Sequence, residues 1–397
     1  MPANDPIVIA SIARTPIGAM QGQFSGLSAT QLGAVAVKAA VERCGPGLKP
    51  EDVEEALLGC VLPAGLGQAP ARQAVLGAGL PKSTGCTTIN KMCGSGLKAI
   101  MLANDLLKSG NGRVMVAGGM ESMTNAPYLL PKARGGYRYG HAQMYDHMAL
   151  DGLEDAYEKG TAMGVYAERT AEKYGFSRAQ QDDFAIASLM RAKKANEDGS
   201  FAFEMTPVEV AGKGGTEKIS RDEGPFKANP DKIPTLKPVF KKDGTVTAAN
   251  SSSISDGAAA AIVMPQSEAS RRGVKPIARI LGHASHARLP GEFTVAPVHA
   301  IAALLDKVGW KTKDVDLWEI NEAFAVVTLA AMKEHTLPHD KVNVHGGACA
   351  LGHPIGASGA RIMATLLGAL KKTGGKRGVA TLCIGGGEAV AMAVEML

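Results

Sequence analysis

The chain has 397 residues, of which 45% are apolar and 20% charged, a composition typical of a soluble globular protein with two or three packed units. Its net charge of +5 is too small and too dispersed to indicate a nucleic-acid-binding surface, whereas a small anionic ligand suits it. We expect no membrane-spanning helix, because no run approaches ~18 uninterrupted apolar residues, and no signal peptide, because the start Met-Pro-Ala-Asn-Asp-Pro lacks a basic and an apolar region.

The first third of the chain predicts alternating strands and helices. Short apolar runs indicate the strands, and apolar residues at helical spacing indicate the helices. The expected strands are 7–12, 56–61 and 114–117, and the expected helices are 27–44, 68–79 and 97–108.

The last third repeats this order. Ser95-Gly96-Leu97-Lys98 matches Ser358-Gly359-Ala360-Arg361 at an offset of 263 residues, and a second match lies at an offset of 262. The later helix continues to Gly374, and strands are expected at 317–320, 379–382 and 388–394. We therefore expect two homologous α/β halves, each built around its own largely buried sheet.

The middle of the chain differs in character and reads as an insertion. Residues 121–246 are aromatic and basic near Tyr137, helical over 164–196 and then loop-like, before a strand at 256–264. The expected units are a first half comprising 1–120 and 247–275, an inserted loop domain at 121–246 that covers the site and binds its ligand, and a second half at 276–397.

Cys93 lies where a short polar turn becomes a helix. The free N–H groups and the positive dipole of a helix N-terminus favour a thiolate, which is the setting of a nucleophile. Without partner groups, a buried structural cysteine is the commoner use of such a turn. A base and oxyanion donors would have to come from elsewhere in the chain.

The residues Gly94 to Ala99 also match the G-x-G-x-x-A dinucleotide pattern. That pattern requires a preceding apolar strand and an acidic residue about 20 positions later. Segment 87–92 is short and polar, and strand 114–117 ends in two glycines. We therefore expect no dinucleotide site here.

Three loops of the second half carry candidate partners for the cysteine. Asn321 follows a predicted strand, His353 lies in a loop dense with glycine, and Cys383 precedes three glycines. A histidine between glycine and proline is poorly placed for packing and well placed for a base. The alternatives are a helix-capping asparagine, a histidine bonded to backbone and a core cysteine.

The remaining histidines and cysteines indicate neither a metal site nor a disulfide frame. Pro338 interrupts the helix that His335 and His339 would need, and His283 with His286 lacks a third ligand. The six cysteines show no C-x-x-C spacing, which favours reduced thiols in a cytoplasmic protein.

Taken together, these segments resemble the thiolase family closely. The matching signatures are the nucleophile turn, NEAFA, GHPIGASG and CIGGG, at 90–96, 321–325, 352–359 and 383–387. Arg14-Thr15-Pro16 also matches, and the likeness extends over essentially the whole chain. Within the family the sequence looks most like the acetyl-CoA acetyltransferases.

This resemblance implies a duplicated five-layer αβαβα fold of the α/β class with an inserted loop domain, and a homotetramer built as a dimer of dimers. It implies no tightly bound cofactor and coenzyme A thioesters as substrates. The implied reaction is the reversible Claisen condensation of two acetyl-CoA to acetoacetyl-CoA and CoA, by a ping-pong route through acyl-Cys93.

Residue by residue, the resemblance makes Cys93 the acylated nucleophile, His353 its base, and Cys383 the acid/base for the CoA thiol or the substrate α-carbon. Asn321 would hold a water that binds the enolate oxygen together with His353. The N–H groups of Cys93 and Gly385 would form a second oxyanion site. Two oxyanion sites and two acid/base groups suit a Claisen condensation, whereas a hydrolase needs one of each.

The implied coenzyme A contacts carry over less completely. Ser252 matches the family's pantetheine-contacting serine, and Ala323 and Phe324 match its neighbours. A frequent His-Met pair is replaced by Ala162-Met163, and Phe293 stands near where a methionine is common. No arginine falls at the adenine-side position, so the residues that bind the nucleotide are not assigned.

The main alternative is a degradative 3-ketoacyl-CoA thiolase with a wider pocket, because segment 251–256 is closer to that branch. A β-ketoacyl synthase would share the fold but needs a second histidine in place of Asn321. A NAD-binding dehydrogenase would be protected against heat by nicotinamide, and a non-catalytic lipid-binding relative is disfavoured because all four reacting positions are filled. His345 and Cys349 receive no role.

Overall fold

The computed structural model describes residues 5–212 and 214–397, so most of the segment tested for a signal peptide lies outside the described residues. Ten strands form the main sheet. They are β1 Ile7–Arg14, β2 Gly18–Ala19, β3 Glu55–Gly59, β4 Gly85–Ile89, β5 Met115–Ser122, β10 Ser255–Pro265, β11 Ala278–Ala287, β12 Leu317–Ile320, β13 Arg377–Ile384 and β14 Glu388–Met396.

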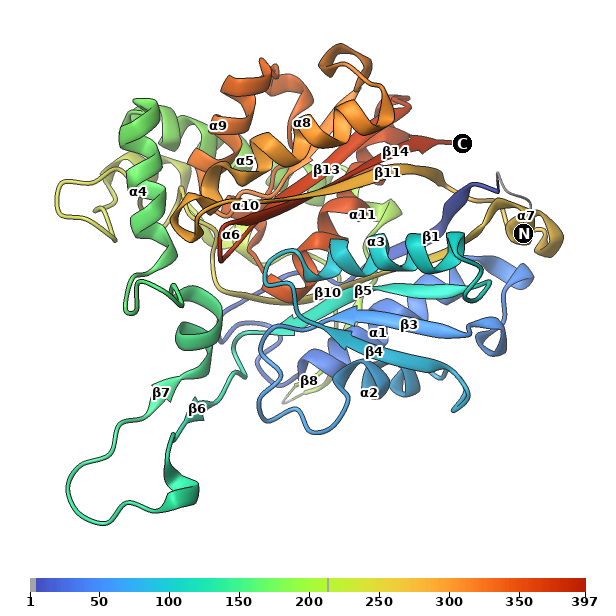
Figure 1. Cartoon of the computed structure of the whole chain (residues 1–397), viewed down its shortest axis with the longest axis horizontal. Helices are drawn as coiled ribbons and strands as arrows, with labels where there is room; N and C mark the ends of the chain where they lie inside the picture. The colour runs from blue at the N-terminus through green and yellow to red at the C-terminus, as the bar shows by residue number, and fades with distance from the viewer. Residues whose placement is uncertain (1–4, 213) are drawn as a thin grey trace.

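These strands follow the order β12-β13-β14-β11-β1-β10-β5-β3-β4, and β2 pairs with β10 (Figure 1). Strand β3 is parallel to β4 and β5 in the first half, and β12 is parallel to β13 in the second. The two halves meet where Val8 pairs with Arg279 and Ile9 pairs with Ala278. The two expected sheets are therefore hydrogen-bonded to each other at one edge.

Six helices sandwich the strands. They are α1 Ala29–Glu42, α2 Pro70–Gly77, α3 Ser95–Lys108, α8 Ala296–Val308, α9 Ala325–His335 and α11 Ile355–Thr373. Apolar residues of α1 and α2 pack on the outer face of the first half, those of α8 and α9 pack on the outer face of the second, and α3 and α11 share a core between the two (Figure 1). The expected αβαβα layering is confirmed. No helix in the described part of the chain is both long and apolar enough to cross a membrane.

The two inner helices touch through a pair of equivalent glycines. A Cβ on Gly96 would lie 2.7 Å from the backbone nitrogen of Ala360, and a Cβ on Gly359 would lie 2.2 Å from that of Leu97. Only glycine allows the backbones to approach this closely. The glycine pattern that resembled a dinucleotide fingerprint therefore serves the packing of α3 against α11, and this packing brings the two catalytic loops to the same end of the molecule.

Three strands of the sheet were not predicted, namely the two-residue β2 and the longer β4 and β11. Strand β4 is polar because it forms the edge of the sheet and stays partly exposed, and it directly precedes the Cys93 turn. Strand β11 alternates buried with partly exposed residues and includes His283 and His286. The strand before Cys93 is therefore not the apolar strand that a dinucleotide site requires, and the glycine packing explains the motif.

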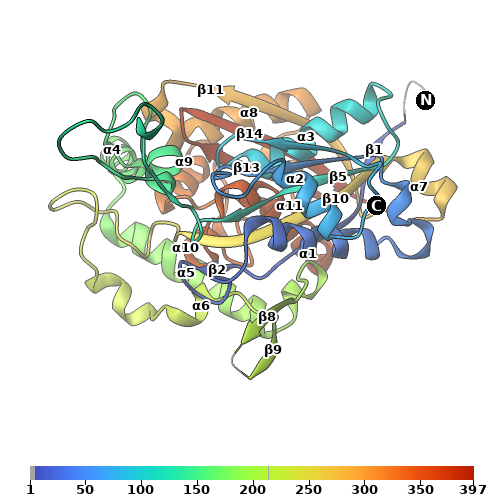
Figure 2. The same ribbon diagram turned by 90° about the horizontal axis from the view of Figure 1, so that it is seen from below.

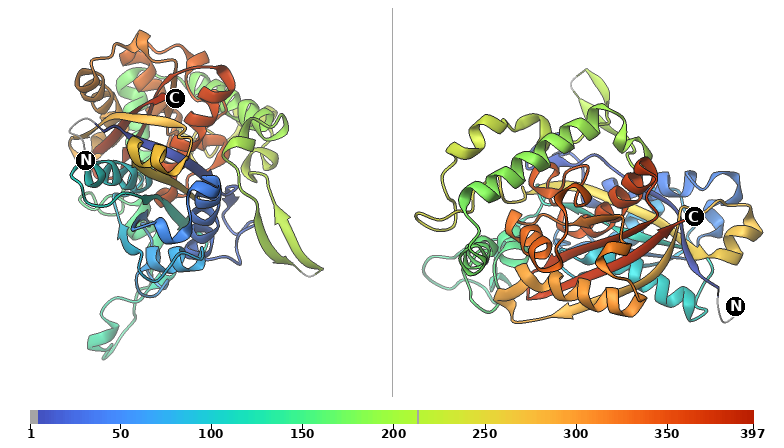
Figure 3. Two further views of the ribbon diagram at one scale, coloured as in Figure 1. Left: turned by 90° about the vertical axis from the view of Figure 1, so that its right-hand side faces the viewer. Right: turned by 90° about the horizontal axis from the view of Figure 1, so that it is seen from above.

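Between β5 and β10 the chain leaves the sheet and forms smaller elements. They are β6 Tyr128–Leu129, β7 Tyr145–Asp146, α4 Met163–Tyr174, α5 Arg178–Glu197, β8 Val208–Gly212, β9 Gly215–Ile219 and α6 Gly224–Lys227. The helical region expected at 164–196 is two helices, because Gly175 ends α4 at a φ of 69° and Ser177 caps α5. Figures 2 and 3 show the β8–β9 hairpin and the β6–β7 segment extending from the body.

Candidate active site

The Cys93 turn is fixed by the first residue of α3. The Oγ of Ser95 accepts a hydrogen bond from the backbone N–H of Lys91 at 2.8 Å and donates to the carbonyl of Met92 at 2.7 Å. Met92 adopts a φ of 48°, which few residues other than glycine tolerate. As the sequence predicted, the cysteine stands immediately before a helix, whose N-cap is Gly94.

The thiol of Cys93 is nevertheless protonated at rest. Loss of solvation around its sulfur, with a smaller contribution from Glu121, raises the pKa of Cys93 to about 11. The backbone N–H groups of Gly385 and of Cys93 itself favour the thiolate, but desolvation outweighs them. The turn alone therefore does not form a thiolate, and a base is required.

Gly385 presents its N–H to Cys93 from the loop that joins β13 to β14. The two glycines that follow it have φ angles of 94° and 93°, and a Cβ on Gly387 would lie 2.6 Å from the carbonyl oxygen of Arg288. An ion pair between Lys91 and Glu388 connects the cysteine turn with this loop. The loop is therefore fixed by the positive φ angles of its glycines and by the close approach at Gly387, and the ion pair ties it to the turn of Cys93.

His353 has one ring nitrogen engaged and one free. Its Nδ1 lies 2.6 Å from the Oγ of Ser358, which also donates to the carbonyl of Pro354 at 2.9 Å. Because the Ser358 hydroxyl donates its hydrogen to the Pro354 carbonyl, the serine oxygen accepts a hydrogen bond from Nδ1–H of His353. The other ring nitrogen, Nε2, is then unprotonated and free to accept a proton. Nε2 has no hydrogen-bond partner among the described residues. Burial, together with the charge of Arg361, lowers the pKa of His353 to about 3, so the imidazole is neutral.

Asn321 lies behind His353 at the end of β12 and is fully buried. Its backbone N–H donates to Thr381 of the neighbouring β13 at 3.0 Å. Its Nδ2 lies 3.5 Å from Nδ1 of His353, and its Oδ1 accepts a hydrogen bond from Arg361 at 3.2 Å. The amide therefore faces the imidazole with its nitrogen.

Cys383 is fully buried at the end of β13. Burial raises the pKa of its thiol well above the ordinary range, and electrostatic repulsion from an ionised Cys93 raises it further. Cys383 packs in the same apolar cluster as Phe293, Ala323 and Phe324. A negative charge on Cys93 therefore makes ionisation of Cys383 harder.

A cavity of about 290 Å³ opens onto this group. It is lined by Cys93, His353 and Gly385 and by all five residues expected to contact coenzyme A, namely Ser252, Met163, Ala323, Phe324 and Phe293. Asn321 and Cys383 lie behind this lining. The structure thus brings together every predicted site residue.

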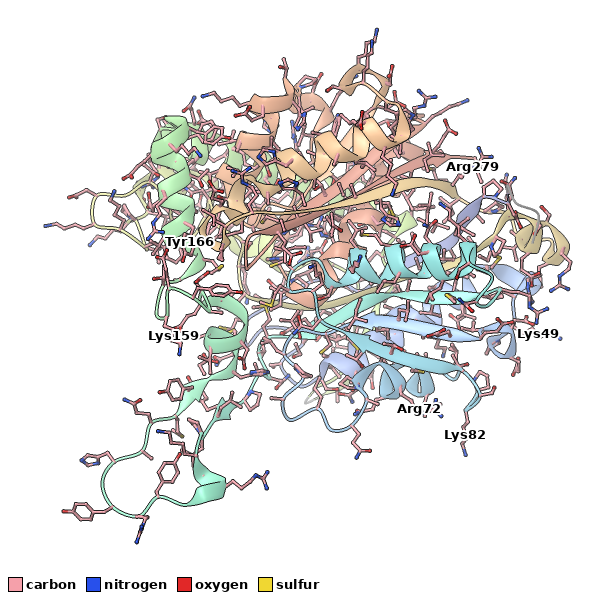
Figure 4. All side chains as sticks on the ribbon, in the orientation of Figure 1. Lys49, Arg72, Lys82, Lys159, Tyr166 and Arg279 are labelled. Atoms are coloured by element: carbon pink, nitrogen blue, oxygen red, sulfur yellow. The ribbon has the colours of Figure 1, made fainter. Side chains whose placement is uncertain are left out.

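The cavity wall also includes residues that the sequence did not reveal. They are Met123, Gly152, Leu153, Gly164, Phe240, Ser251, Ser253 and Ile254. These residues come from the insertion or from its return into β10, and no signature motif marks them. Ala162, from the position of the His-Met pair, and Ile355, from the GHPIGASG motif, line the cavity too. A larger cavity of about 440 Å³ lies beside α4, where Figure 4 labels Tyr166, and its lining includes neither the nucleophile nor the base.

The two residues left without a role, His345 and Cys349, lie outside the cavity lining. The buried carboxylate of Glu322 accepts hydrogen bonds from Ser188, Asn343 and the N–H of Cys349, at 2.7, 2.8 and 3.0 Å. Cys349 therefore helps to hold the segment that carries Asn321. His345 packs edge-on against Phe201, with ring centroids 5.8 Å apart, and burial lowers its pKa to about 4.

The histidines considered as metal ligands make other contacts. His335 lies 2.8 Å from the carbonyl of Val298, and His283 lies 2.8 Å from a carboxylate oxygen of Asp105. Within residues 5–212 and 214–397, no group of three or more His, Cys, Asp or Glu side chains is arranged to hold a metal ion.

Comparison with known proteins places this arrangement in a family. Residues 7–267 match the model of the thiolase N-terminal domain, and residues 274–396 match that of the thiolase C-terminal domain. A mitochondrial acetyl-CoA acetyltransferase A of Xenopus laevis is 50% identical over 393 residues, which cover 98% of this chain and 92% of the relative.

Solved structures agree with the sequence relatives. The acetyl-CoA acetyltransferase of Bacillus anthracis superimposes with a TM-score of 0.95 at 38% identity, covering 99% of both chains. A thiolase of Ascaris suum, solved in complex with coenzyme A, gives a TM-score of 0.93 at 43% identity and covers 99% of this chain and 100% of its own. On its sequence, its fold and the residues gathered at its cavity, the chain belongs to the thiolase family.

Proposed function

We propose that the chain is an acetyl-CoA C-acetyltransferase that condenses two acetyl-CoA to acetoacetyl-CoA and CoA, reversibly and through an acetyl-cysteine. The observation that carries the proposal is the convergence of Cys93, His353 and Gly385 on one cavity, with Cys383 directly behind. A single thiol and base would serve hydrolysis. A second buried thiol beside the first supplies the additional acid/base that carbon–carbon bond formation requires.

The acylation half begins with proton transfer from the Cys93 thiol to Nε2 of His353, because the thiol is protonated and the imidazole neutral at physiological pH. The thiolate attacks the thioester carbonyl, and the new C–S bond pushes the carbonyl electrons onto oxygen. We assign stabilisation of that oxyanion to the N–H groups of Cys93 and Gly385, which also stabilise negative charge on the sulfur. The C–S bond to CoA then breaks, and the CoA thiolate takes the proton of the Cys383 thiol and leaves as CoA. Cys383 is then a thiolate, and the proton from Cys93 remains on His353.

The condensation half needs a carbanion equivalent. The thiolate of Cys383 removes a proton from the methyl carbon of a second acetyl-CoA, and the electron pair moves onto the thioester oxygen. We assign the stabilisation of this enolate oxygen to the Nδ2 side of Asn321, through a bound water, and to His353. The enolate carbon attacks the acetyl group, the bond to the Cys93 sulfur breaks, and acetoacetyl-CoA is released. The Cys93 thiolate takes its proton back from Nε2 of His353, and Cys383 keeps the proton from the methyl carbon. Thiolysis follows the same steps in reverse.

The cavity favours a short acyl group over the long chains of a degradative 3-ketoacyl-CoA thiolase. The ring of Phe293 packs edge-on against Tyr166 and Phe324, with centroids 6.1 and 6.5 Å apart. Phe293 and Phe324 line the cavity onto which Cys93 opens, and Tyr166 packs behind Phe293. A chain extended beyond a few carbons would have to displace them.

We assign the binding of the pantetheine arm to the cavity residues Ser252, Met163, Ala323, Phe324 and Phe293, and the covering of the site to an inserted loop domain at 121–246. The backbone N–H of Ser252 donates to the carbonyl of Ala323 at 2.9 Å, which joins the two segments that line the cavity. The two halves, at 1–120 with 247–275 and at 276–397, supply the reacting groups.

We also propose that the chain assembles as a homotetramer, a dimer of dimers. The segment that carries β6 and β7 projects from the body and exposes Tyr128, Tyr139 and Met144, with exposed fractions of 67%, 104% and 70% (Figure 1). Apolar side chains on a projecting arm are typical of a contact surface. Strand β4 offers an open sheet edge as a second one. Light scattering of the protein with residues 130–144 removed is expected to show dimers.

For the compartment we propose the cytoplasm, on the ground that all six cysteines are free. The Xenopus laevis relative is a mitochondrial protein by its name. Because the mitochondrial matrix is also reducing, fractionation of cells that express the chain decides between the two.

The activity itself is tested with the purified protein and acetyl-CoA. Release of CoA together with acetoacetyl-CoA supports the proposal, and CoA-dependent cleavage of acetoacetyl-CoA supports its reverse. Release of CoA with free acetate and no acetoacetyl-CoA would instead identify a hydrolase.

A further inference from the structure

We propose that Arg361 is a positioning residue for condensation, because its guanidinium holds the Asn321 amide with the nitrogen toward the reacting groups. This inference rests on the function proposed above and deepens it. It concerns a residue that neither lines the cavity nor touches the sulfurs.

Arg361 occupies the second turn of α11, eight residues after the catalytic imidazole, and is 2% exposed. One of its terminal nitrogens donates to a carboxylate oxygen of Glu319 at 2.9 Å, and the other donates to Oδ1 of Asn321 at 3.2 Å. Glu319 and Asn321 lie two positions apart at the end of β12, so their side chains share one face. The guanidinium fork joins both of them to the inner helix.

The orientation of the Asn321 amide follows from which hydrogen-bond donors and acceptors face it. A guanidinium carries donors and no acceptor, so only the oxygen of an amide can face it favourably. If the Asn321 amide turned over, its NH₂ group would meet a cation, and its oxygen would face His353. Arg361 therefore selects the orientation in which Nδ2 points toward the imidazole, at 3.5 Å.

The selected orientation matters because the Nδ1 position of His353 is already held by Ser358 at 2.6 Å. The Nδ2 hydrogens of Asn321 are then available to an acceptor on the catalytic side. An enolate oxygen needs donors, delivered directly or through a bound water, and an amide oxygen in that place would repel it. Acylation of Cys93 relies on the N–H groups of Cys93 and Gly385 instead, so it should not depend on Arg361.

The test replaces both Glu319 and Arg361 with uncharged residues, so that neither side chain is left as a buried charge without its partner. Burial raises the pKa of Glu319 to about 8, so Glu319→Gln alone is mild and keeps the contact between Arg361 and Asn321. The double variant Glu319→Gln/Arg361→Met removes that contact and leaves no unpaired buried ion. Condensation of acetyl-CoA and the acetylation of Cys93 are measured for both variants, together with thermal midpoints.

We expect Glu319→Gln to condense acetyl-CoA at close to the wild-type rate. The double variant is expected to lose about 10²-fold in kcat for condensation, the typical effect of one oxyanion donor, with the rate of Cys93 acetylation and KM for acetyl-CoA little changed. Adding Asn321→Ala to the double variant should cause no further loss beyond Asn321→Ala alone, because no amide remains to orient. If the double variant fails to fold, Glu319→Gln/Arg361→Gln replaces it, because a glutamine amide carries both a donor and an acceptor and does not select one orientation, and a condensation-specific loss is again expected.

Arg361 also acts on His353 through its positive charge, which lowers the pKa of the imidazole. Removing that charge is a second way in which the double variant can change the reaction rate. A loss caused by protonation of the imidazole would shrink as the pH rises, whereas a turned amide causes the same loss at pH 7 and pH 9. Equal loss of acetylation and condensation, additive loss with Asn321→Ala, or recovery at high pH would each overturn the inference. A wild-type protein that neither condenses nor cleaves would overturn the proposed function instead.

Discussion

Ser358 holds the imidazole of His353 through a contact of 2.6 Å between its Oγ and Nδ1. The equivalent serine of the first half, Ser95, holds the Cys93 turn through its bonds to Lys91 and Met92. Each half therefore uses a hydroxyl near the start of its inner helix to fix the proposed catalytic residue that precedes it. The proposed nucleophile belongs to one half and its proposed base to the other.

Replacing Ser358 with alanine is expected to lower kcat for condensation by about ten- to a hundredfold. The change removes the hydrogen bond that sets the tautomer of His353, and a hydrogen bond of this kind is typically worth about 1 to 3 kcal/mol. Alkylation of Cys93 by iodoacetamide at pH 7 should slow in parallel, because the thiolate depends on that base. Thr373→Ala is the matched control, because Thr373 also bonds a carbonyl one turn back in α11, at 2.9 Å, but lies far from the cavity. An unchanged alkylation rate in Ser358→Ala would show that the serine does not set the base.

Glu121 is expected to make stability fall as the pH rises. Burial raises the pKa of this carboxyl to about 7 from 4.5, against hydrogen bonds from the N–H groups of Val61, Leu62 and Gly356. The folded state therefore binds a proton more tightly than the unfolded state, so this contribution is fully present below pH 4.5 and is lost as the pH rises through 7. A shift of this size corresponds to about 3 kcal/mol.

The measurement is the free energy of unfolding in urea at pH 5 and pH 8 for the wild type and for Glu121→Gln. The difference between the two proteins should change with pH, with the wild type losing more stability at pH 8 than the variant does. Asp183→Asn is a suitable control, because the Asp183 side chain is exposed on the surface of α5. Parallel pH profiles for wild type and Glu121→Gln would contradict the raised pKa.

Phe293 is expected to limit acyl length. Phe293→Val should raise kcat/KM for a longer 3-ketoacyl-CoA relative to acetoacetyl-CoA by at least about tenfold, because even one methylene in an apolar pocket is worth about 1 to 3 kcal/mol of discrimination. Phe176→Val is the control. Phe176 stacks on Tyr174 with centroids 5.4 Å apart, packs against the same apolar cluster and does not line the cavity. A preference that moves equally in both variants would assign chain length to other residues.

Much of this architecture could be predicted from local sequence. The Cys93 turn, the loop of His353 and the end of β13 are short motifs whose glycines and polar residues have few other uses, and the repeat at an offset of 263 predicts the two halves. Strand β4 escaped prediction because an edge strand needs no apolar run, and Gly175 was not recognised as the break between α4 and α5.

The electrostatics of the site could not be predicted in the same way. The helix N-terminus argued for a thiolate at Cys93, but desolvation by residues distant in the sequence reverses the shift. The contact between Arg361 and Asn321 likewise depends on how α11 crosses β12. Both effects arise from tertiary packing and leave no signal in a local motif.

We propose that Cys93 carries the acetyl group and that Cys383 acts as acid and base in condensation. Trapping the acetyl group on the protein separates these two roles. Each protein is incubated with acetyl-CoA labelled in the acetyl group, quenched in acid and digested, and the labelled peptide is identified by mass spectrometry. We expect label on Cys93 in wild type and in Cys383→Ser, no label in Cys93→Ser, and acetoacetyl-CoA formation in the wild type alone. Label at the wild-type level in Cys93→Ser would show that Cys93 is not the acylated residue. Acetoacetyl-CoA made by Cys383→Ser at the wild-type rate would show that Cys383 is not needed for condensation.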